Sequence, residues 1–310
     1  MTDQPRRVAY ELLRLVAAED AYANLTLPRM IGESGLTGRD AAFATELGYG
    51  TLRAVGVLDE ILGVCSSRPL TDVDPGVVDL LRLGAYQLLR TRVPAHAAVA
   101  STVDLARATR NGRAAGFVNA VLRRVGTDDW DAWTDRLAAG GSELRRIALR
   151  TAHPEWIAAA FAEALDGDLA ETAAALEADD MRPQTHLVAW PGRIDRDELV
   201  RETGGTPGPH SPFAVRLSGG DPGAIEAVRD RRAAVQDEGS QLCAIRAADT
   251  SLDGRDEQWL DLCAGPGGKA ALLAALGAQR GARVTAVELH PHRAELVRNH
   301  TSPWDVDVVV

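Results

Sequence analysis

A glycine-rich segment near the carboxyl end of the chain, LDLCAGPGGKA from Leu260 to Ala270, has the residue types and spacing of a ligand-binding loop. Its apolar start predicts a strand, and its glycines predict a tight turn, because glycine accepts positive φ and lets a ligand approach the backbone. The free N–H groups and the dipole of the helix expected next favour the electronegative parts of a ligand. Lys269, in the first turn of that helix, is the only lysine among the chain's 34 lysine and arginine residues, which indicates a use for a compact positive charge.

Two phosphate-binding classes of loop match this segment to different degrees. A P-loop requires glycine five positions before the Gly-Lys pair and serine or threonine after it, but the chain has Cys263 and Ala270 there. A dinucleotide-binding loop fits better, since Gly265, Gly267 and Ala270 match its G-x-G-x-x-G/A pattern and an acid, Glu288, ends the next expected strand. The dinucleotide interpretation therefore stays open, beside the plain alternative that the glycines only form a turn.

S-adenosylmethionine is the third ligand that such a loop can hold, and it has a zwitterionic methionine part and a ribose but no phosphate. Backbone groups and Lys269 could hold the methionine end, while Glu288 could accept hydrogen bonds from the two ribose hydroxyls. A pyrophosphate site would not need Asp261, Pro266 or Lys269, all of which the segment contains. These residues favour the S-adenosylmethionine interpretation.

Two segments together resemble a known family. VQDEGSQL at Val235–Leu242, followed by Asp261–Lys269, resembles the RsmB (Sun/Fmu) ribosomal RNA cytosine-5 methyltransferases, with Gly265 where many members carry alanine and Ala270 where many carry threonine. The resemblance covers nearly the whole chain, and it implies methylation of cytosine C5 in small-subunit ribosomal RNA. It also implies that one set of residues lines the S-adenosylmethionine site: Cys263, Ala264, Gly265, Pro266, Gly267, Gly268, Lys269 and Glu288.

The family's catalytic cysteines have no counterpart in this sequence. The resemblance implies one cysteine thiolate that adds to C6 of cytosine and a second cysteine that assists product release. Those cysteines follow proline and threonine, whereas Cys65, Cys243 and Cys263 follow valine or leucine. We therefore expect no catalytic residue in the chain. Because it ends in the apolar run 306–310, which reads as a buried parallel strand, we expect an incomplete methyltransferase domain that is inactive alone.

Apolar spacing divides the chain into three expected domains. Residues 1–127 repeat apolar side chains at helical spacing, which predicts an all-α domain, and this region resembles NusB-like RNA-binding domains. Residues 128–230 are expected to form a linker and a small mixed α/β region, with a strand beginning near Thr185. Residues 231–310 read as part of a Rossmann-like methyltransferase domain, with strands at 259–262, 283–288 and 306–310 separated by helices. Helical spacing assigns three tryptophans to core or interdomain packing: Trp130, Trp133 and Trp156.

An arginine-rich stretch lies in the helical region of a chain whose formal net charge is −10. Between positions 90 and 124 a single acid, Asp104, accompanies seven arginines: Arg90, Arg92, Arg107, Arg110, Arg113, Arg123 and Arg124. Guanidinium groups suit phosphate, so these residues are candidates for RNA contact through the backbone. A solvated helical face is nearly as good an explanation, because neighbours in sequence need not gather in space.

Composition limits the remaining classes of function. No apolar run approaches the roughly 18 residues of a membrane span, so we expect a cytoplasmic protein without a membrane partner. Three widely spaced cysteines form neither a disulfide framework nor a zinc pattern and are expected to be buried thiols. His290, His292 and His300 lack the spacing of a common zinc site, so no metal is expected.

Three functional hypotheses remain. The favoured one is an S-adenosylmethionine-dependent ribosomal RNA methyltransferase. The alternatives are a non-catalytic NusB-like protein of the antitermination type, which would use only the helical domain to bind RNA, and a nicotinamide enzyme that uses the glycine loop for its dinucleotide.

Overall fold

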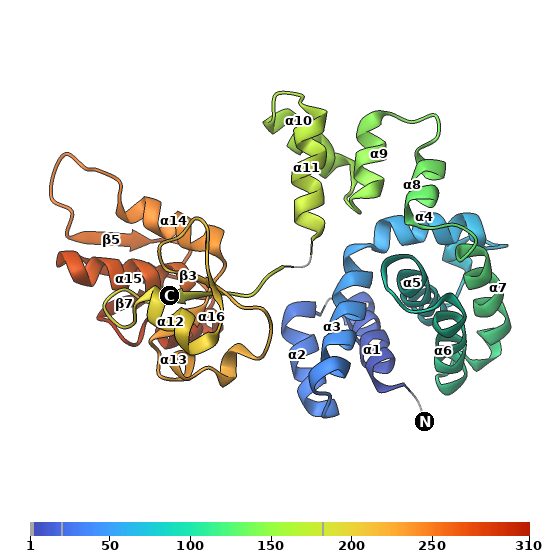
Figure 1. The fold of residues 1–310 in the computed structure, drawn as a ribbon, viewed down its shortest axis with the longest axis horizontal. Coiled ribbons are helices and arrows are strands. Elements are labelled where there is room, and N and C mark those ends of the chain that lie inside the picture. Colours follow the sequence, from blue (N-terminus) through green and yellow to red (C-terminus); the bar gives the residue numbers. More distant parts are fainter. Residues whose placement is uncertain (1–2, 20, 182) are drawn as a thin grey trace. The chain divides into compact units, whose positions relative to one another are not determined.

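The chain forms two compact units in a computed structural model that describes residues 3–19, 21–181 and 183–310. The first, up to Met181, is helical, and the second, from residue 182 to Val310, contains all the strands of the described residues (Figure 1). The predicted fold class, an all-α region followed by mixed α/β and then a strand–helix repeat, is confirmed.

Amphipathic helices build the core of the first unit. On α5, for example, Asp74 accepts a hydrogen bond from Gly76 N–H and Pro75 occupies the first turn, so the helix starts sharply. Its Leu80, Leu81 and Leu83 are completely buried among the other helices. The helices around this core are α1 (Gln4–Glu19), α2 (Ala23–Ser34), α3 (Gly38–Arg53), α4 (Val55–Cys65), α5 (Pro75–Arg90), α6 (Ala95–Ala108) and α7 (Ala115–Val125).

Four further helices extend the first unit. They are α8 (Trp130–Ala138), α9 (Glu143–Arg150), α10 (Glu155–Ala164) and α11 (Leu169–Asp180). Trp130 and Trp133 are buried in the main helical core, as predicted. Trp156 is 73% exposed, so the prediction that it packs in a core is wrong for its own unit. The reason is that α10 buries little beyond Ala158, which contacts Ile147 of α9 and Leu176 of α11.

The second unit begins with a small antiparallel sheet in the order β2-β3-β1-β4. Leu187 of β1 pairs with Val215 of β3 on one side and with Val235 of β4 on the other. The elements of this layer are β1 (His186–Ala189), α12 (Arg196–Thr203), β2 (Thr206–Pro207), β3 (Ala214–Arg216), α13 (Glu226–Arg229) and β4 (Ala233–Val235). The strand predicted near Thr185 is thus confirmed as β1.

A parallel sheet in the order β5-β6-β7 completes the second unit. Its strands alternate with helices, as predicted: α14 (Glu238–Ala248), β5 (Gln258–Asp261), α15 (Gly268–Arg280), β6 (Arg283–Val287), α16 (Pro291–Thr301) and β7 (Val306–Val309). Parallel pairing places the carboxyl ends of β5 and β6 side by side, with Asp261 opposite Ala286. The loop that follows β5 therefore lies beside the residue that follows β6.

The prediction that the last strand is buried is wrong. Ala286 and Val308 pack against Val297 of α16, which accounts for one face of the sheet. On the opposite face Leu260 is 60% and Val309 is 42% exposed. An apolar run such as 306–310 is typical of a strand that is buried on both faces of a sheet. In the described residues, helices cover only one face of this sheet.

Candidate functional site

The loop between β5 and α15 is tied to the ends of two strands. Asp261 Oδ1 accepts a hydrogen bond of 3.1 Å from the backbone N–H of Cys263, which turns the chain at the end of β5. The backbone N–H of Ala264 then donates to the carbonyl oxygen of Val287 at the end of β6, at 3.0 Å. These two bonds hold the loop across the carboxyl edge of the sheet, where ligands of open α/β sheets bind.

Gly267 is the position in this loop that only glycine can occupy without strain. Its φ is +118°, and a Cβ there would lie 2.9 Å from His300 Cβ and 3.0 Å from Val297 Cα. The close approach of α16 thus fixes the path of the loop into α15. No described side chain caps α15, and the first intrahelical bond runs from Ala271 N–H to Gly267 oxygen. The N–H groups of the first turn are consequently available to a ligand.

Glu288 lies directly against this loop. A Cβ at Gly265 would come within 2.1 Å of Glu288 Oε2, so the carboxylate fills the space that the missing side chain leaves. Arg293 of α16 holds both residues: its Nη2 donates to the Gly265 carbonyl oxygen at 2.9 Å, and its Nε lies 3.5 Å from Glu288 Oε2. The structure therefore brings together two residues that the sequence proposed for one site.

The Glu288 carboxylate is stabilised in its charged form. The backbone N–H of His290 donates to Oε1 at 3.0 Å, and this bond, with the nearby Arg293 guanidinium, lowers the pKa of Glu288 below its usual value despite desolvation. An ionised carboxylate is a strong hydrogen-bond acceptor. Glu288 can thus accept hydrogen bonds from hydroxyl groups at neutral and mildly acidic pH.

The other predicted loop residues differ in exposure. Ala264 is buried beneath the loop, whereas Cys263, Pro266 and Lys269 are exposed.

The expectation of three buried thiols is wrong, because Cys243 and Cys263 are exposed and only Cys65 is buried. Cys263 is exposed because it belongs to the surface loop rather than to β5. In the helical core, burial raises the pKa of the Cys65 thiol and disfavours its thiolate.

The QDEGSQ segment, which is part of the VQDEGSQL motif at Val235–Leu242, lies beside this loop, where Gln236 is close to Gly268. Asp237 accepts hydrogen bonds from the N–H groups of Gly239 and Ser240 and so caps α14. Glu238 Oε1 accepts from the N–H groups of His210 and Ser211 at 2.7 and 2.8 Å, which fixes the preceding loop. Burial, the largest single effect, raises the pKa of Glu238, but these hydrogen bonds and Arg216 together lower it below the usual value.

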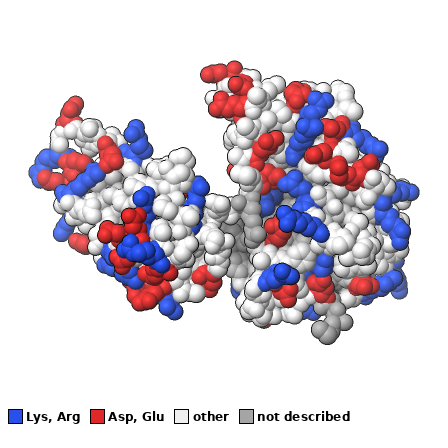
Figure 2. Space-filling model, in the orientation of Figure 1, with Lys and Arg blue, Asp and Glu red and all other residues white. Residues whose placement is uncertain are grey.

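The arginine-rich stretch does not form one uniform group in the structure. Arg92, Arg107, Arg110, Arg113, Arg123 and Arg124 are exposed. Arg107 pairs with Asp104 at 3.0 Å, and Arg124 donates to the carbonyl oxygen of Cys65 at 3.0 Å. On the face drawn in Figure 2, basic and acidic side chains are interspersed over the helical unit rather than gathered in one basic patch.

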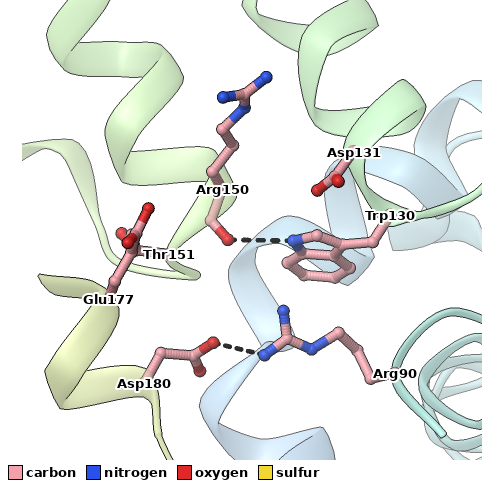
Figure 3. A pocket seen from close by; sticks show the side chains of 7 residues that line it. All are labelled: Arg90, Trp130, Asp131, Arg150, Thr151, Glu177 and Asp180. Atoms are coloured by element: carbon pink, nitrogen blue, oxygen red, sulfur yellow. Dashed lines mark hydrogen bonds and ion pairs between the residues drawn. The ribbon is translucent and has the colours of Figure 1, made fainter. Parts of the chain in front are cut away.

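Arg90 has a different environment from the other six. Its guanidinium pairs with Asp180, as Figure 3 shows. The same group lies 4.6 Å from the ring centroid of Trp130. Trp130 in turn donates from Nε1 to the carbonyl oxygen of Arg150 at 3.0 Å. These side chains line a polar pocket of about 340 Å³. Arg90 therefore connects α5 to the end of α11.

Sequence reasoning missed two residues of the candidate site. Arg293 is one surface arginine among many and carries no signal of its own. Gln236 belongs to the VQDEGSQL segment, which was quoted for the family resemblance without a role for this residue. The structure places its buried side chain against Gly268 at the beginning of α15.

Comparison with known proteins agrees with both units. Residues 3–127 match the NusB family, and residues 250–309 match the family described as 16S rRNA methyltransferase RsmB/F. A protein of Mycobacterium tuberculosis, Rv1407, whose name describes a methyltransferase of unstated substrate, is 53% identical over 99% of this chain and 68% of its own length. The chain belongs to the RsmB/F methyltransferase family.

Further RsmB/F relatives carry more specific names. A Bacillus subtilis protein that carries the name ribosomal RNA small subunit methyltransferase B is 33% identical to this chain, over 94% of this chain and 64% of its own length. The Cronobacter sakazakii enzyme of the same name is 32% identical, over 94% of this chain and 65% of its own length. The crystal structure of PH0851 superimposes with a TM-score of 0.73 at 15% identity, covering 100% of this chain and 69% of that one, which supports the fold.

Two further features of the described residues bear on the predicted partners. No helix within the described residues is long and apolar enough to cross a membrane. Over the same residues, no three His, Cys, Asp or Glu side chains are grouped so that they could hold a metal ion. His300 Nδ1 instead lies 2.9 Å from the carbonyl oxygen of Leu296.

Proposed function

We propose that this chain contributes to an S-adenosylmethionine-dependent methyltransferase that acts on C5 of cytosine in small-subunit ribosomal RNA. Family membership supports the transfer of a methyl group to 16S rRNA. The cofactor and the target atom are proposals that follow from the motif and from the geometry of the loop.

The observation that carries the proposal is the contact between Glu288 and Gly265 at the carboxyl edge of the parallel sheet. A carboxylate held in its charged form beside an uncapped helix start suits a ligand that has hydroxyl donors at one end and a carboxylate at the other. We assign the ribose hydroxyls to Glu288 and the methionine end to the α15 N–H groups and Lys269. The residues proposed to line this site are Cys263, Ala264, Gly265, Pro266, Gly267, Gly268, Lys269 and Glu288.

The bound cofactor would supply a methyl group on a sulfonium centre, while the residues of this chain bind and orient it. We assign none of the chain's cysteines as the nucleophile that activates cytosine. Cys65 is buried in the helical unit with a raised pKa, Cys243 lies on α14, and Cys263 lies two positions after Asp261 in the cofactor loop.

The helical unit is proposed to bind ribosomal RNA through phosphate contacts. The match to the NusB family over residues 3–127 and the exposed arginines of α6 and α7 support this role. Arg92, Arg107, Arg110, Arg113, Arg123 and Arg124 are the candidates with exposed side chains. Arg90 would first have to exchange its pairing with Asp180.

Ligand-observed NMR with S-adenosylhomocysteine and, separately, NADH tests the cofactor assignment. We expect binding of S-adenosylhomocysteine and loss of that binding in Gly267→Val, whose branched side chain would enter the space beside His300. NADH binding without S-adenosylhomocysteine binding would instead support a nicotinamide enzyme. RNA binding with neither ligand bound would support the antitermination-type alternative.

A further inference from the structure

Gln236 is buried, yet its amide oxygen has no partner. The residue is 6% exposed, and no described residue donates a hydrogen bond to Oε1. Its Nε2 has only a weak contact of 3.4 Å with Ser240 Oγ. Leaving a buried acceptor unpaired costs free energy, because the group has lost its hydrogen bonds to water, so such a group calls for an explanation.

The backbone around Gln236 is fixed, so the unpaired oxygen does not result from a loose segment. Its N–H donates to the carbonyl oxygen of His186 at 3.1 Å, and its own carbonyl oxygen accepts from Gln241 Nε2 at 2.9 Å. Asp237 and Glu238 are fully engaged in capping α14 and in holding the preceding loop. Within this segment, Gln236 alone has a buried side-chain atom without a partner among the described residues.

The Gln236 side chain lies against the start of α15. A Cβ at Gly268 would be 3.6 Å from Gln236 Cδ and 3.7 Å from Nε2, so Gly268 leaves the amide next to the first helical turn. The N–H groups of that turn need acceptors. Beside them, the amide presents one acceptor and two donors.

We propose that the Gln236 amide binds the α-amino-acid head group of the cofactor. Its Oε1 accepts a hydrogen bond from the ammonium, while Nε2 and the first-turn N–H groups of α15 donate to the carboxylate. This inference rests on the proposed function, because it assumes S-adenosylmethionine as the ligand of the loop. It adds a recognition residue for one end of that ligand.

A second unpaired oxygen agrees with a ligand that donates hydrogen bonds. Asp261 Oδ2, at the end of β5, is buried and has no partner among the described residues, although Oδ1 is engaged by Cys263. An ammonium offers three donors, whereas a pyrophosphate offers only acceptors. Unpaired oxygens at Gln236 and Asp261 therefore favour an amino-acid head group over a dinucleotide.

The test compares two ligands that differ only at the amino-acid end. S-adenosylhomocysteine has this end, and 5′-methylthioadenosine lacks it. We expect Gln236→Met, which keeps the length of the side chain but removes its polar atoms, to weaken S-adenosylhomocysteine binding at least about tenfold, because both hydrogen bonds of the amide to charged groups are lost. Affinity for 5′-methylthioadenosine should not change. Gln258→Met, at the exposed amino end of β5, is the matched control and should affect neither ligand.

Each outcome is informative. Equal S-adenosylhomocysteine affinity in Gln236→Met and wild type, or an equal loss for both ligands, would overturn the assignment of Gln236 and leave the cofactor site standing. Failure of the wild type to bind S-adenosylhomocysteine would remove the proposed cofactor site and this inference with it. Thermal melting checks that the variant is folded, and Gln236→Leu serves as a second variant with the same expected ligand selectivity.

Discussion

Arg293 donates a hydrogen bond of 2.9 Å to the carbonyl oxygen of Gly265, a residue 28 positions earlier in the chain. The same guanidinium lies 3.5 Å from the Glu288 carboxylate, so one side chain of α16 holds the loop and the acid in register. We expect Arg293→Ala to weaken S-adenosylhomocysteine binding about tenfold with a small change in stability, since Arg293 is half-exposed and Glu288 keeps its hydrogen bond from the His290 N–H. Arg298→Ala, on the same helix, is the control, and equal affinities would show that Arg293 does not position the site.

Gly265 and Gly267 should respond differently to the same added methyl group. A Cβ at Gly265 would meet the ends of two flexible side chains, Glu288 and Arg293, which can move aside. A Cβ at Gly267 would meet the backbone of Val297 in a conformation with φ of +118°. We expect Gly265→Ala to fold with a loss below about 1 kcal/mol and Gly267→Ala to lose roughly 1–3 kcal/mol. Urea denaturation measures both, and equal losses would contradict this account of the loop.

The lowered pKa of Glu288 predicts how stability depends on pH. Because the folded-state pKa lies below the ordinary value of 4.5, the stabilisation from this ionised group is present above pH 4.5 and is lost as pH falls through the folded-state pKa. The stability difference between wild type and Glu288→Gln should therefore be largest near neutral pH and shrink below pH 4.5. Thermal melting across this range checks it, with Glu295→Gln, on the neighbouring helix α16, as a control. A constant difference would refute the lowered pKa.

Salt dependence should separate arginines that meet RNA from those that do not. If Arg107, Arg110 and Arg113 each contact a phosphate, replacing all three with glutamine should reduce the slope of log affinity against log salt by up to roughly three. The Asp104 pairing of Arg107 is exposed and can be exchanged at little cost. Filter binding of structured ribosomal RNA measures the slope. The triple variant Arg201→Gln, Arg229→Gln and Arg255→Gln is the control, and an unchanged slope in the first triple would identify a solvated face.

The Arg90–Asp180 pair should contribute to the stability of the helical extension. Both side chains are largely buried, with 26% and 17% exposed, and Arg90 also stacks on Trp130. A double-mutant cycle with Arg90→Gln and Asp180→Asn should give a coupling energy of roughly 1–2 kcal/mol. Arg107→Gln with Asp104→Asn is the exposed control and should give a smaller value. No coupling between Arg90 and Asp180 would mean that the pair does not hold α11.

Much of the parallel sheet and its loop could be predicted from the sequence, because local patterns determine them. Glycine spacing after an apolar run predicted the turn before α15, and parallel pairing of adjacent strands predicted that Glu288 would lie near it. Local patterns could not predict which faces of the parallel sheet are covered by helices. The apolar run of β7 has the composition of a buried strand, yet Val309 is 42% exposed.

The contacts made by Gln236 and Arg293 could not be predicted from local sequence patterns. Gln236 is buried because β4 and α14 bring it against Gly268, a contact between segments far apart in the sequence. Arg293 is one of many exposed arginines, and only its distance to Gly265 distinguishes it. Trp156 illustrates the reverse error, since helical spacing assigned it to core or interdomain packing and α10 provides no core position for it in its own unit.

The single lysine of the chain, Lys269, makes the loop a site for selective chemical labelling. Every other basic side chain among the 34 lysines and arginines is a guanidinium, which does not react with amine-directed reagents under mild conditions, whereas the Lys269 amine is exposed at the start of α15. A reporter group attached through an amine-reactive ester would therefore mark this loop and the amino terminus only. A bound ligand should slow the reaction at Lys269, so protection from the reagent would report occupancy of the loop in the unmutated chain.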